Sequence, residues 1–290
     1  MRITKLELAP AMLGESPLWD PDIATLFWVD TIRSTVRSFH PGSGRERSWP
    51  TPSWVGSIGL GRPGHLILAL RDGFHSLALA TGAIVPLWRP EPVDERVRFN
   101  DGKMDRSGRF LCGSMGLHAE PLGSLYRLRT DGGADRLMDG IRIANTLCFS
   151  PAGDILYFAD SLSRQILAFD YDITGDEVGP PRVLIDTAAL GSGPDGATVD
   201  AEGFLWVALV QTGQLARISQ QGSVDRLIDL PLDLPSCPAF GGDDLDILYV
   251  TSIKDSGSGR AVSRHADGGS ILAIEGLGLR GLPEARLRPA

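Results

Sequence analysis

The sequence lacks the features of disulfide-stabilised, secreted and membrane-spanning proteins. It has three cysteines in 290 residues (Cys112, Cys148 and Cys237), and this small, odd and scattered set does not form a disulfide framework. No apolar run approaches the roughly 18 residues that a membrane-spanning helix needs, and residues 1–13 lack the apolar block of a signal peptide. We therefore expect a soluble, cytoplasmic protein.

Positive charge is also scarce. The chain has 28 Lys and Arg against 36 Asp and Glu, a net charge of −8, and a pI near 5.1. Nucleic acids and anionic membranes gain nothing from an acidic surface, so neither is an expected partner. In contrast, the 35 glycines and 20 prolines are abundant. Such a surplus of turn-forming residues, spread along the chain, indicates many short elements joined by tight turns.

A short pattern repeats six times along the chain. In each copy a Gly or Asp turn precedes an apolar strand of about five residues, then an alternating strand and a short outer strand. The second residues of the apolar strands lie at intervals of 40, 44, 46, 49 and 43 residues. These marker residues are Phe27, Ile67, Leu111, Tyr157, Trp206 and Tyr249.

Repeats of 40–50 residues with four strands each have the size of a β-propeller blade. We therefore predict an all-β fold: a single domain over residues 1–290, with six four-stranded blades around a central channel. We expect residues 3–8 and 279–287 to complete one blade between them, because this removes an exposed edge. A large β-sandwich is the alternative, but a sandwich does not require equally spaced segments.

Polar residues recur at one position of the repeat. The innermost strand of a propeller blade lines the channel, and here it precedes the apolar strand, so the axial positions lie 11 or 12 residues before each marker. Equivalent positions face one axis, and we expect their oxygens to converge at one end of the channel, where they suit a hard divalent cation. Any one of these residues taken alone is more typical of an Asn or Asp that caps a turn, but four in the same phase of the repeat favour a shared site. The six axial positions are Glu15, Val55 or Gly56, Asn100, Asn145, Asp195 and Cys237.

Several segments around these positions resemble the SMP-30/gluconolactonase/regucalcin family. They are residues 13–19 (LGESPLW), 98–105 (RFNDGKMD), 145–161, 193–196 (GPDG) and 238–252, and the matches continue in order to about residue 275. The resemblance implies a six-bladed propeller with one divalent cation near the axis and, most commonly, sugar-lactone hydrolysis.

By position, the resemblance places the metal ligands of the family on Glu15, Asn145 and Asp195. Its substrate-binding Arg and Asn fall on Arg98 and Asn100. Members of the family use Ca, Zn, Mn, Mg or Fe, and a site made only of oxygen donors does not choose firmly among them.

The chain departs from the family pattern at two positions. Thr146 follows the ligand Asn, where some members have Gly, and this change affects either the pocket or a turn. His118 stands where other members have a carboxylate, with Glu120 close by, so His118 is a further candidate for substrate binding. The sugar preference is open at this point.

The expected function is metal-dependent hydrolysis of a sugar lactone to the aldonic acid. The cation would polarise the lactone carbonyl and activate water, with Asp195 as both ligand and general base. The expected partner is the small-molecule lactone, and the expected state is a monomer or a small homo-oligomer. The alternatives are a broader esterase or organophosphate hydrolase on the same fold, and a Ca²⁺-binding regulatory protein without turnover.

Two further features are of interest. Cys237 shares the axial position, so we expect it to line the pocket, although no paired base identifies it as a nucleophile. Residues 255–260 (DSGSGR) form a loop between strands, either a linker or a lid at the end of the channel.

Overall fold

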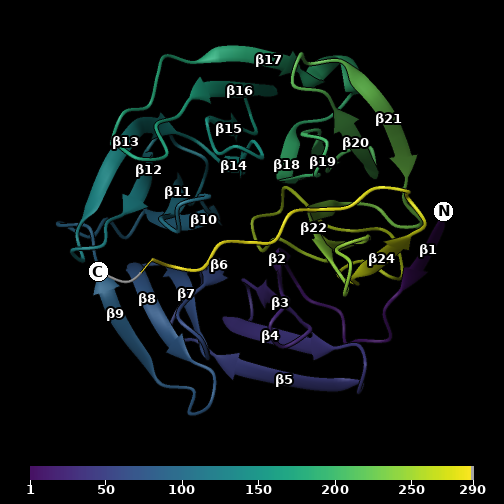
Figure 1. Ribbon diagram of the computed structural model, residues 1–290, viewed down its shortest axis with the longest axis horizontal. Helices are drawn as coiled ribbons and strands as arrows, with labels where there is room; N and C mark the ends of the chain where they lie inside the picture. The colour runs from purple at the N-terminus through teal and green to yellow at the C-terminus, as the bar shows by residue number, and fades with distance from the viewer. Residues whose placement is uncertain (289–290) are drawn as a thin grey trace.

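The computed structural model describes residues 1–288, and these form six four-stranded antiparallel sheets arranged in a ring (Figure 1). The predicted six-bladed β-propeller is therefore confirmed. In the described part of the chain the helical content is one 3₁₀ turn, Thr187–Leu190. No helix within residues 1–288 has the length and apolar content needed to cross a membrane.

The blades follow one another along the chain, each beginning with its innermost strand. Blade 1 contains β2 (Gly14–Asp20), β3 (Thr25–Asp30), β4 (Thr35–His40) and β5 (Arg45–Pro50). Blade 2 contains β6 (Val55–Leu60), β7 (His65–Leu70), β8 (Gly73–Ala78) and β9 (Ile84–Trp88). Blade 3 contains β10 (Val97–Met104), β11 (Phe110–Gly116), β12 (Gly123–Leu128) and β13 (Ala134–Ile141).

The second half of the ring repeats this order. Blade 4 contains β14 (Ala144–Phe149), β15 (Ile155–Asp160), β16 (Gln165–Asp170) and β17 (Arg182–Asp186). Blade 5 contains β18 (Pro194–Val199), β19 (Leu205–Leu209), β20 (Gln214–Ile218) and β21 (Val224–Asp229). Blade 6 contains β22 (Pro235–Gly241), β23 (Ile247–Ser252), β24 (Leu272–Glu275) and, as its outermost strand, β1 (Arg2–Lys5).

The hydrophobic core lies between the blades. Each pair of neighbouring blades buries one apolar cluster, and the described residues form six such clusters. Between blades 5 and 6, for example, Trp206 packs edge-on against Phe240, and between blades 6 and 1, Trp19 stacks on Tyr249. Because the second strand of each blade is apolar on both faces, it packs against both neighbours. This explains why the apolar strand was the clearest sequence signal.

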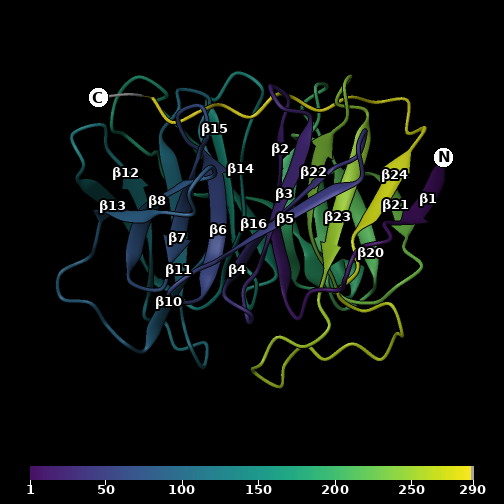
Figure 2. The ribbon, with the colours of Figure 1, turned by 90° about the horizontal axis from the view of Figure 1, so that it is seen from below.

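The chain ends differ from the prediction. Blade 6 is completed by β1 alone, which pairs with β24 from Arg2 opposite Glu275 to Lys5 opposite Leu272. Residues 276–288, here called the closing segment, instead cross one face of the ring from blade 6 to blade 3 (Figures 1 and 2). Their backbone bonds to several blades explain the difference: the N–H of Leu287 donates to the carbonyl of Leu60 over 2.7 Å, and that of Arg288 to Gly108 over 2.9 Å.

Candidate metal and substrate site

A β-bulge interrupts each of the six innermost strands at or next to the predicted axial position. The pairing register shifts between Glu15 and Leu18 in β2, between Pro194 and Ala197 in β18, and at equivalent points in the other four. A bulge turns the local side chains out of the regular alternation of a strand. The repeat therefore brings bulged residues from six blades to one end of the channel, here called the site end.

Arg98, Asn100 and Asn145 form one hydrogen-bonded chain across blades 3 and 4. Arg98 Nη1 donates to Asn100 Oδ1 over 2.6 Å, and Asn100 Nδ2 donates to Asn145 Oδ1 over 3.1 Å. Asn145 Nδ2 donates in turn to Ser161 Oγ over 2.8 Å, and the Ser161 hydroxyl donates to the carbonyl of Pro194 over 2.7 Å. These bonds fix both amides in place and leave one lone pair of Asn145 Oδ1 available to a ligand.

Glu15 and Asp195 bring carboxylates to the site end from blades 1 and 5. Burial, together with the negative charges of Asp195 and Asp101, raises the pKa of Glu15 well above its usual range. Burial and the charge of Asp101 raise the pKa of Asp195 to about 8. The three carboxylates therefore lie within electrostatic range of one another, with the Arg98 guanidinium as a nearby positive charge that lowers both pKa values.

We did not predict Asp101, the third carboxylate of this group, from the sequence. It is 8% exposed, and its Oδ2 accepts a 2.8 Å hydrogen bond from the backbone N–H of Leu147 in β14. Burial raises the pKa of Asp101 to about 6. In β10 the bulge places two residues, Asn100 and Asp101, opposite one residue of β11. The Asn-Asp-Gly run is the signal in the sequence that could have identified it.

Arg98 retains donors for a ligand. Within residues 1–288 its guanidinium makes hydrogen bonds through Nη1, to Asn100 Oδ1 and to the carbonyl of Phe99 at 3.0 Å. Burial lowers the pKa of Arg98 to about 10, even though Glu15 and Asp195 favour its charged form. The side chain therefore keeps its positive charge at neutral pH, with Nη2 and Nε available.

His118 is exposed to solvent, whereas Cys237 is buried. His118 lies on the turn after β11, at the site end, and its hydrogen bonds within residues 1–288 are made by its backbone. Its N–H donates to Glu120 Oε2 over 3.0 Å, and its carbonyl accepts a hydrogen bond from Arg260. Cys237 lies in the channel wall, as predicted, but burial and nearby carboxylates raise the pKa of its thiol, which is the opposite of what a nucleophile needs.

Thr146 adopts the left-handed backbone conformation, with φ of 58°. This region favours glycine, so a β-branched residue there is strained. The Thr146 hydroxyl donates a 2.6 Å hydrogen bond to the carbonyl of Asp195 in the next blade. Thr146 therefore keeps the turn that a glycine would form with less strain, and it ties the Asn145 bulge to the Asp195 bulge.

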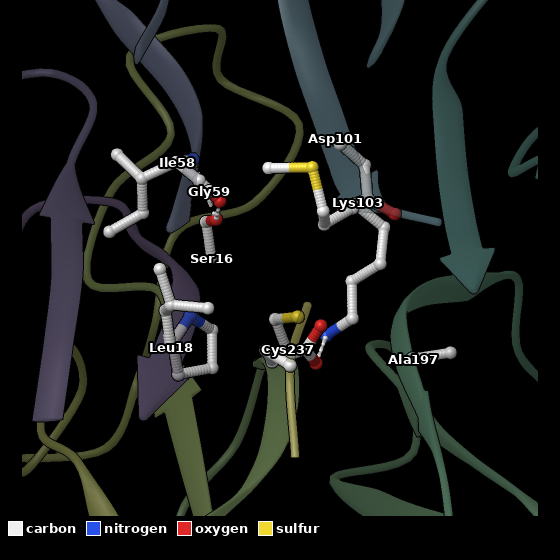
Figure 3. A pocket seen from close by; sticks show the side chains of 12 residues that line it. Ser16, Leu18, Ile58, Gly59, Asp101, Lys103, Ala197 and Cys237 are labelled. Atoms are coloured by element: carbon white, nitrogen blue, oxygen red, sulfur yellow. Dashed lines mark hydrogen bonds and ion pairs between the residues drawn. The ribbon is translucent and has the colours of Figure 1, made fainter. Parts of the chain in front are cut away.

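A small cavity lies below the carboxylates, in the middle of the channel (Figure 3). Its volume is about 10 Å³, which is the space of one water molecule. In Figure 3 the Lys103 side chain extends across it from β10 toward Cys237. Lys103 Nζ forms a 2.7 Å ion pair with Glu284 of the closing segment, and these side chains are 13% and 11% exposed. This ion pair and the closing segment block the far end of the channel, so the site opens at one end.

The charge balance fits a divalent cation at the site end. Glu15, Asp101 and Asp195 can carry three negative charges against the one positive charge of Arg98, and carboxylate and amide oxygens are the donors that hard cations prefer. Within residues 1–288, no three His, Cys, Asp or Glu side chains are grouped closely enough to hold a metal ion by themselves. A ligand set built from Glu15 and Asp195 therefore needs the amide oxygen of Asn145.

Comparison with known proteins places this geometry in context. Residues 13–254 match the family model described as the SMP-30/Gluconolactonase/LRE-like region. Regucalcin of Xenopus laevis is 34% identical over 277 residues, which cover 93% of each chain. A Bacillus subtilis protein named "Putative sugar lactone lactonase YvrE" is 32% identical over 247 residues, or 84% of this chain and 85% of that one. A solved structure of regucalcin from Agrobacterium tumefaciens, described as a calcium-binding protein, has a TM-score of 0.89 and 29% identity, covering 97% of this chain and 95% of that one.

Proposed function

The chain belongs to the SMP-30/gluconolactonase/LRE-like family, and we propose that it hydrolyses a sugar lactone to the aldonic acid with the help of one divalent cation. The observation that carries the proposal is the presence of donors beside acceptors at the site end. An ion site alone needs only oxygens, whereas Arg98 adds positively charged N–H groups that a polyhydroxylated molecule can use. The Nδ2 of Asn100 donates to the carbonyl of Ala144 and to Asn145 Oδ1, so Asn100 can offer a ligand its Oδ1 as an acceptor. The name of the Bacillus subtilis relative points to the same class of substrate.

Glu15, Asn145 and Asp195 are the residues that would hold the cation, through carboxylate and amide oxygens. Their donor chemistry suits Ca, Mg, Mn, Zn or Fe. When bound, a divalent cation supplies Lewis-acid polarisation of an ester carbonyl.

Asp195 is the proposed general base. One Oδ atom takes a proton from the attacking water, whose oxygen bonds to the lactone carbonyl carbon. The ring C–O bond then breaks, and the ring oxygen leaves as a hydroxyl after receiving a proton, so that lactone and water give the open hydroxy acid. Without a cation, burial and the charge of Asp101 raise the pKa of Asp195 to about 8. The positive charge of a bound cation would lower this pKa, so that the carboxylate is ionised and able to accept the proton.

Arg98 and Asn100 orient the substrate. The free Nη2 and Nε of Arg98 can donate to ring hydroxyls in a fixed fork, and the bond from Arg98 to Asn100 sets the angle of that fork. Because the far end of the channel is closed, substrate and water enter and leave by the site end.

Four variants and one control test the proposal. Glu15→Gln and Asp195→Asn should bind metal more weakly in calorimetry after chelator treatment, and unchanged metal affinity in both would refute the ligand assignment. Arg98→Ala and Asn100→Ala should retain metal but lose about 5- to 150-fold in kcat/KM on aldonolactones. Arg142→Ala, an exposed arginine at the start of blade 4, serves as the control and should match the parent. Unchanged kinetics in both Arg98→Ala and Asn100→Ala would remove these residues from the substrate site.

A second candidate function is calcium binding without turnover. It is favoured by the description of the Agrobacterium tumefaciens relative as a calcium-binding protein. A parent protein that binds Ca²⁺ at Glu15 and Asp195 but hydrolyses no lactone, with any of the five metals, would support this candidate over the hydrolase.

A further inference from the structure

The loop between β23 and β24 forms a hairpin at the site end of the ring. Figure 2 shows this loop projecting from the face opposite the closing segment. Asp255 and Val262 form an antiparallel bridge, and the N–H of Ser256 donates to the carbonyl of Ala261 over 2.9 Å. Two glycines in the tip, Gly257 and Gly259, have φ of 70° and 73°, which lets the chain reverse there. The loop of residues 255–262 is therefore an ordered hairpin rather than a plain linker.

The hairpin crosses the open end of the channel. It comes from blade 6, and Arg260 Nη2 at its tip donates a hydrogen bond to the carbonyl of His118, on the turn after β11 in blade 3. Each innermost strand packs against those of its two neighbours, in the order β2, β6, β10, β14, β18, β22 and back to β2. Blades 3 and 6 therefore lie opposite each other, and a contact between them at this end must span the axis.

The base of the hairpin is firmly held, whereas its tip is not. At the base, the backbone N–H groups of Lys254 and Asp255 donate to the carbonyl of Met12 over 2.8 and 2.9 Å, and that of Arg264 to Asp233 Oδ2 over 2.9 Å. At the tip, the one hydrogen bond to blade 3 within residues 1–288 is that from Arg260. Segments with few buried contacts and one exposed bond open locally at low cost. The tip can therefore release while the base stays in place.

We propose that residues 255–262 form a lid over the site, latched by Arg260, and that this lid disfavours substrates long enough to extend past it. The second part rests on the proposed lactonase function. The reasoning is spatial: Lys103 and Glu284 close the channel below the carboxylates, and the lid crosses it above. A molecule that extends from the site past the lid therefore has to break the bond between Arg260 and His118.

Hydrogen exchange tests the latch without any substrate. In Arg260→Ala, the backbone amides of residues 256–261 should exchange about five- to tenfold faster than in the parent, because one charged hydrogen bond is lost. Arg260→Lys retains one donor and should recover part of the protection. Arg264→Ala is the matched control: the residue is exposed on the same loop, and its backbone, which makes the bond to Asp233, is retained. Equal exchange in Arg260→Ala and the parent would overturn the latch.

Kinetics test the size limit. We would compare kcat/KM for a single-ring aldonolactone with that for an aldonolactone carrying a second sugar ring. Arg260→Ala should shift this ratio by about fivefold or more toward the larger substrate, and Arg264→Ala should leave it unchanged. An unchanged ratio in Arg260→Ala would refute the size limit. A parent that hydrolyses no lactone would refute the proposed function and the size limit together, and faster exchange in Arg260→Ala would then still support the latch.

Discussion

Replacing Glu284 with Gln should destabilise the protein far more than breaking an exposed ion pair, because it leaves the Lys103 ammonium unpaired inside the channel. The two groups are 2.7 Å apart, and their side chains are 13% and 11% exposed. Burial disfavours the charge of Lys103, but the Glu284 carboxylate, together with Cys237 and Cys148, more than offsets this effect and raises the pKa of Lys103 above its usual value. Removing the Glu284 carboxylate therefore leaves the buried Lys103 ammonium without the ion-pair partner that stabilises its charge.

The expected loss follows from the burial of the pair. Breaking an exposed ion pair costs about 0–1 kcal/mol, whereas removing one partner of a buried pair costs about 3–5 kcal/mol. Lys103 lies close enough to Asp101 to lower the pKa of that carboxyl, so a second carboxylate partly compensates. We therefore expect a loss at the lower end, about 3 kcal/mol, which corresponds to a fall in Tm of roughly 6 °C for a chain of this length.

Urea unfolding of four variants checks this magnitude: Glu284→Gln, Lys103→Met, the double variant of these two, and Glu275→Gln. The double variant Lys103→Met with Glu284→Gln should be more stable than Glu284→Gln alone, because it leaves no uncompensated charge. Glu275→Gln, which breaks the exposed pair with Arg2, is the control and should cost less than about 1 kcal/mol. A Glu284→Gln protein within 1 kcal/mol of the parent, or a double variant whose loss equals the sum of the two single losses, would refute the reasoning.

Three other outcomes are expected. In metal-saturated protein, Asp195→Asn should lower kcat by about 100-fold or more in steady-state assays, since an amide cannot accept the proton; full activity would remove Asp195 as the base. The metal-free protein should lose stability as pH rises from about 4 to about 8, because burial raises the pKa of Asp195 to about 8 and of Asp101 to about 6, so the folded state binds more protons than the unfolded state in this range. Thermal melts in the presence of a chelator should show this loss of stability with rising pH, and the loss should be smaller in Asp195→Asn. A dependence of Tm on pH in Asp195→Asn that is identical to that of the parent would contradict this prediction. Asp200→Ala should cost about 3–5 kcal/mol in urea unfolding, because Arg217, whose side chain is 4% exposed, loses its 2.8 Å bond to Asp200. Asp225→Ala removes a more exposed partner of Arg217 and should cost less than about 1 kcal/mol. Equal losses in the two variants would contradict the view that Asp200 is the main partner of Arg217.

The features that repeat could be predicted from the sequence. The apolar strand of each blade packs against both neighbouring blades, so its continuous run of apolar residues identifies it as the second strand of a blade. The axial positions follow from the same period, which is why Glu15, Asn100, Asn145 and Asp195 were found in the innermost strands. Repetition thus predicted both the architecture and the blades that contribute to the candidate site.

Features that occur once could not be predicted in this way. Asp101 is the second of the two bulge residues in β10, and the same place in β2, β14 and β18 holds Pro17, Leu147 and Gly196, so no repeated carboxylate indicates it. The pairing of Lys103 with Glu284 joins a blade to a segment outside the repeats, so no spacing indicates it. For the same reason, the path of the closing segment across the ring differed from the expected strand in blade 6.

Because β1 pairs with β24, blade 6 can be completed only after nearly the whole chain has been synthesised. Arg2 and Glu275 lie opposite each other although they are 273 positions apart in the sequence. On the ribosome, residues 2–5 are made long before their partner strand, so they remain unpaired while five blades assemble. Closing so long a loop costs entropy and makes the last step of folding slow relative to the local hairpins. Until it happens, β24 presents an open edge to any other strand nearby. The newly made chain is therefore most prone to pair with a second copy of itself in the interval before β1 docks.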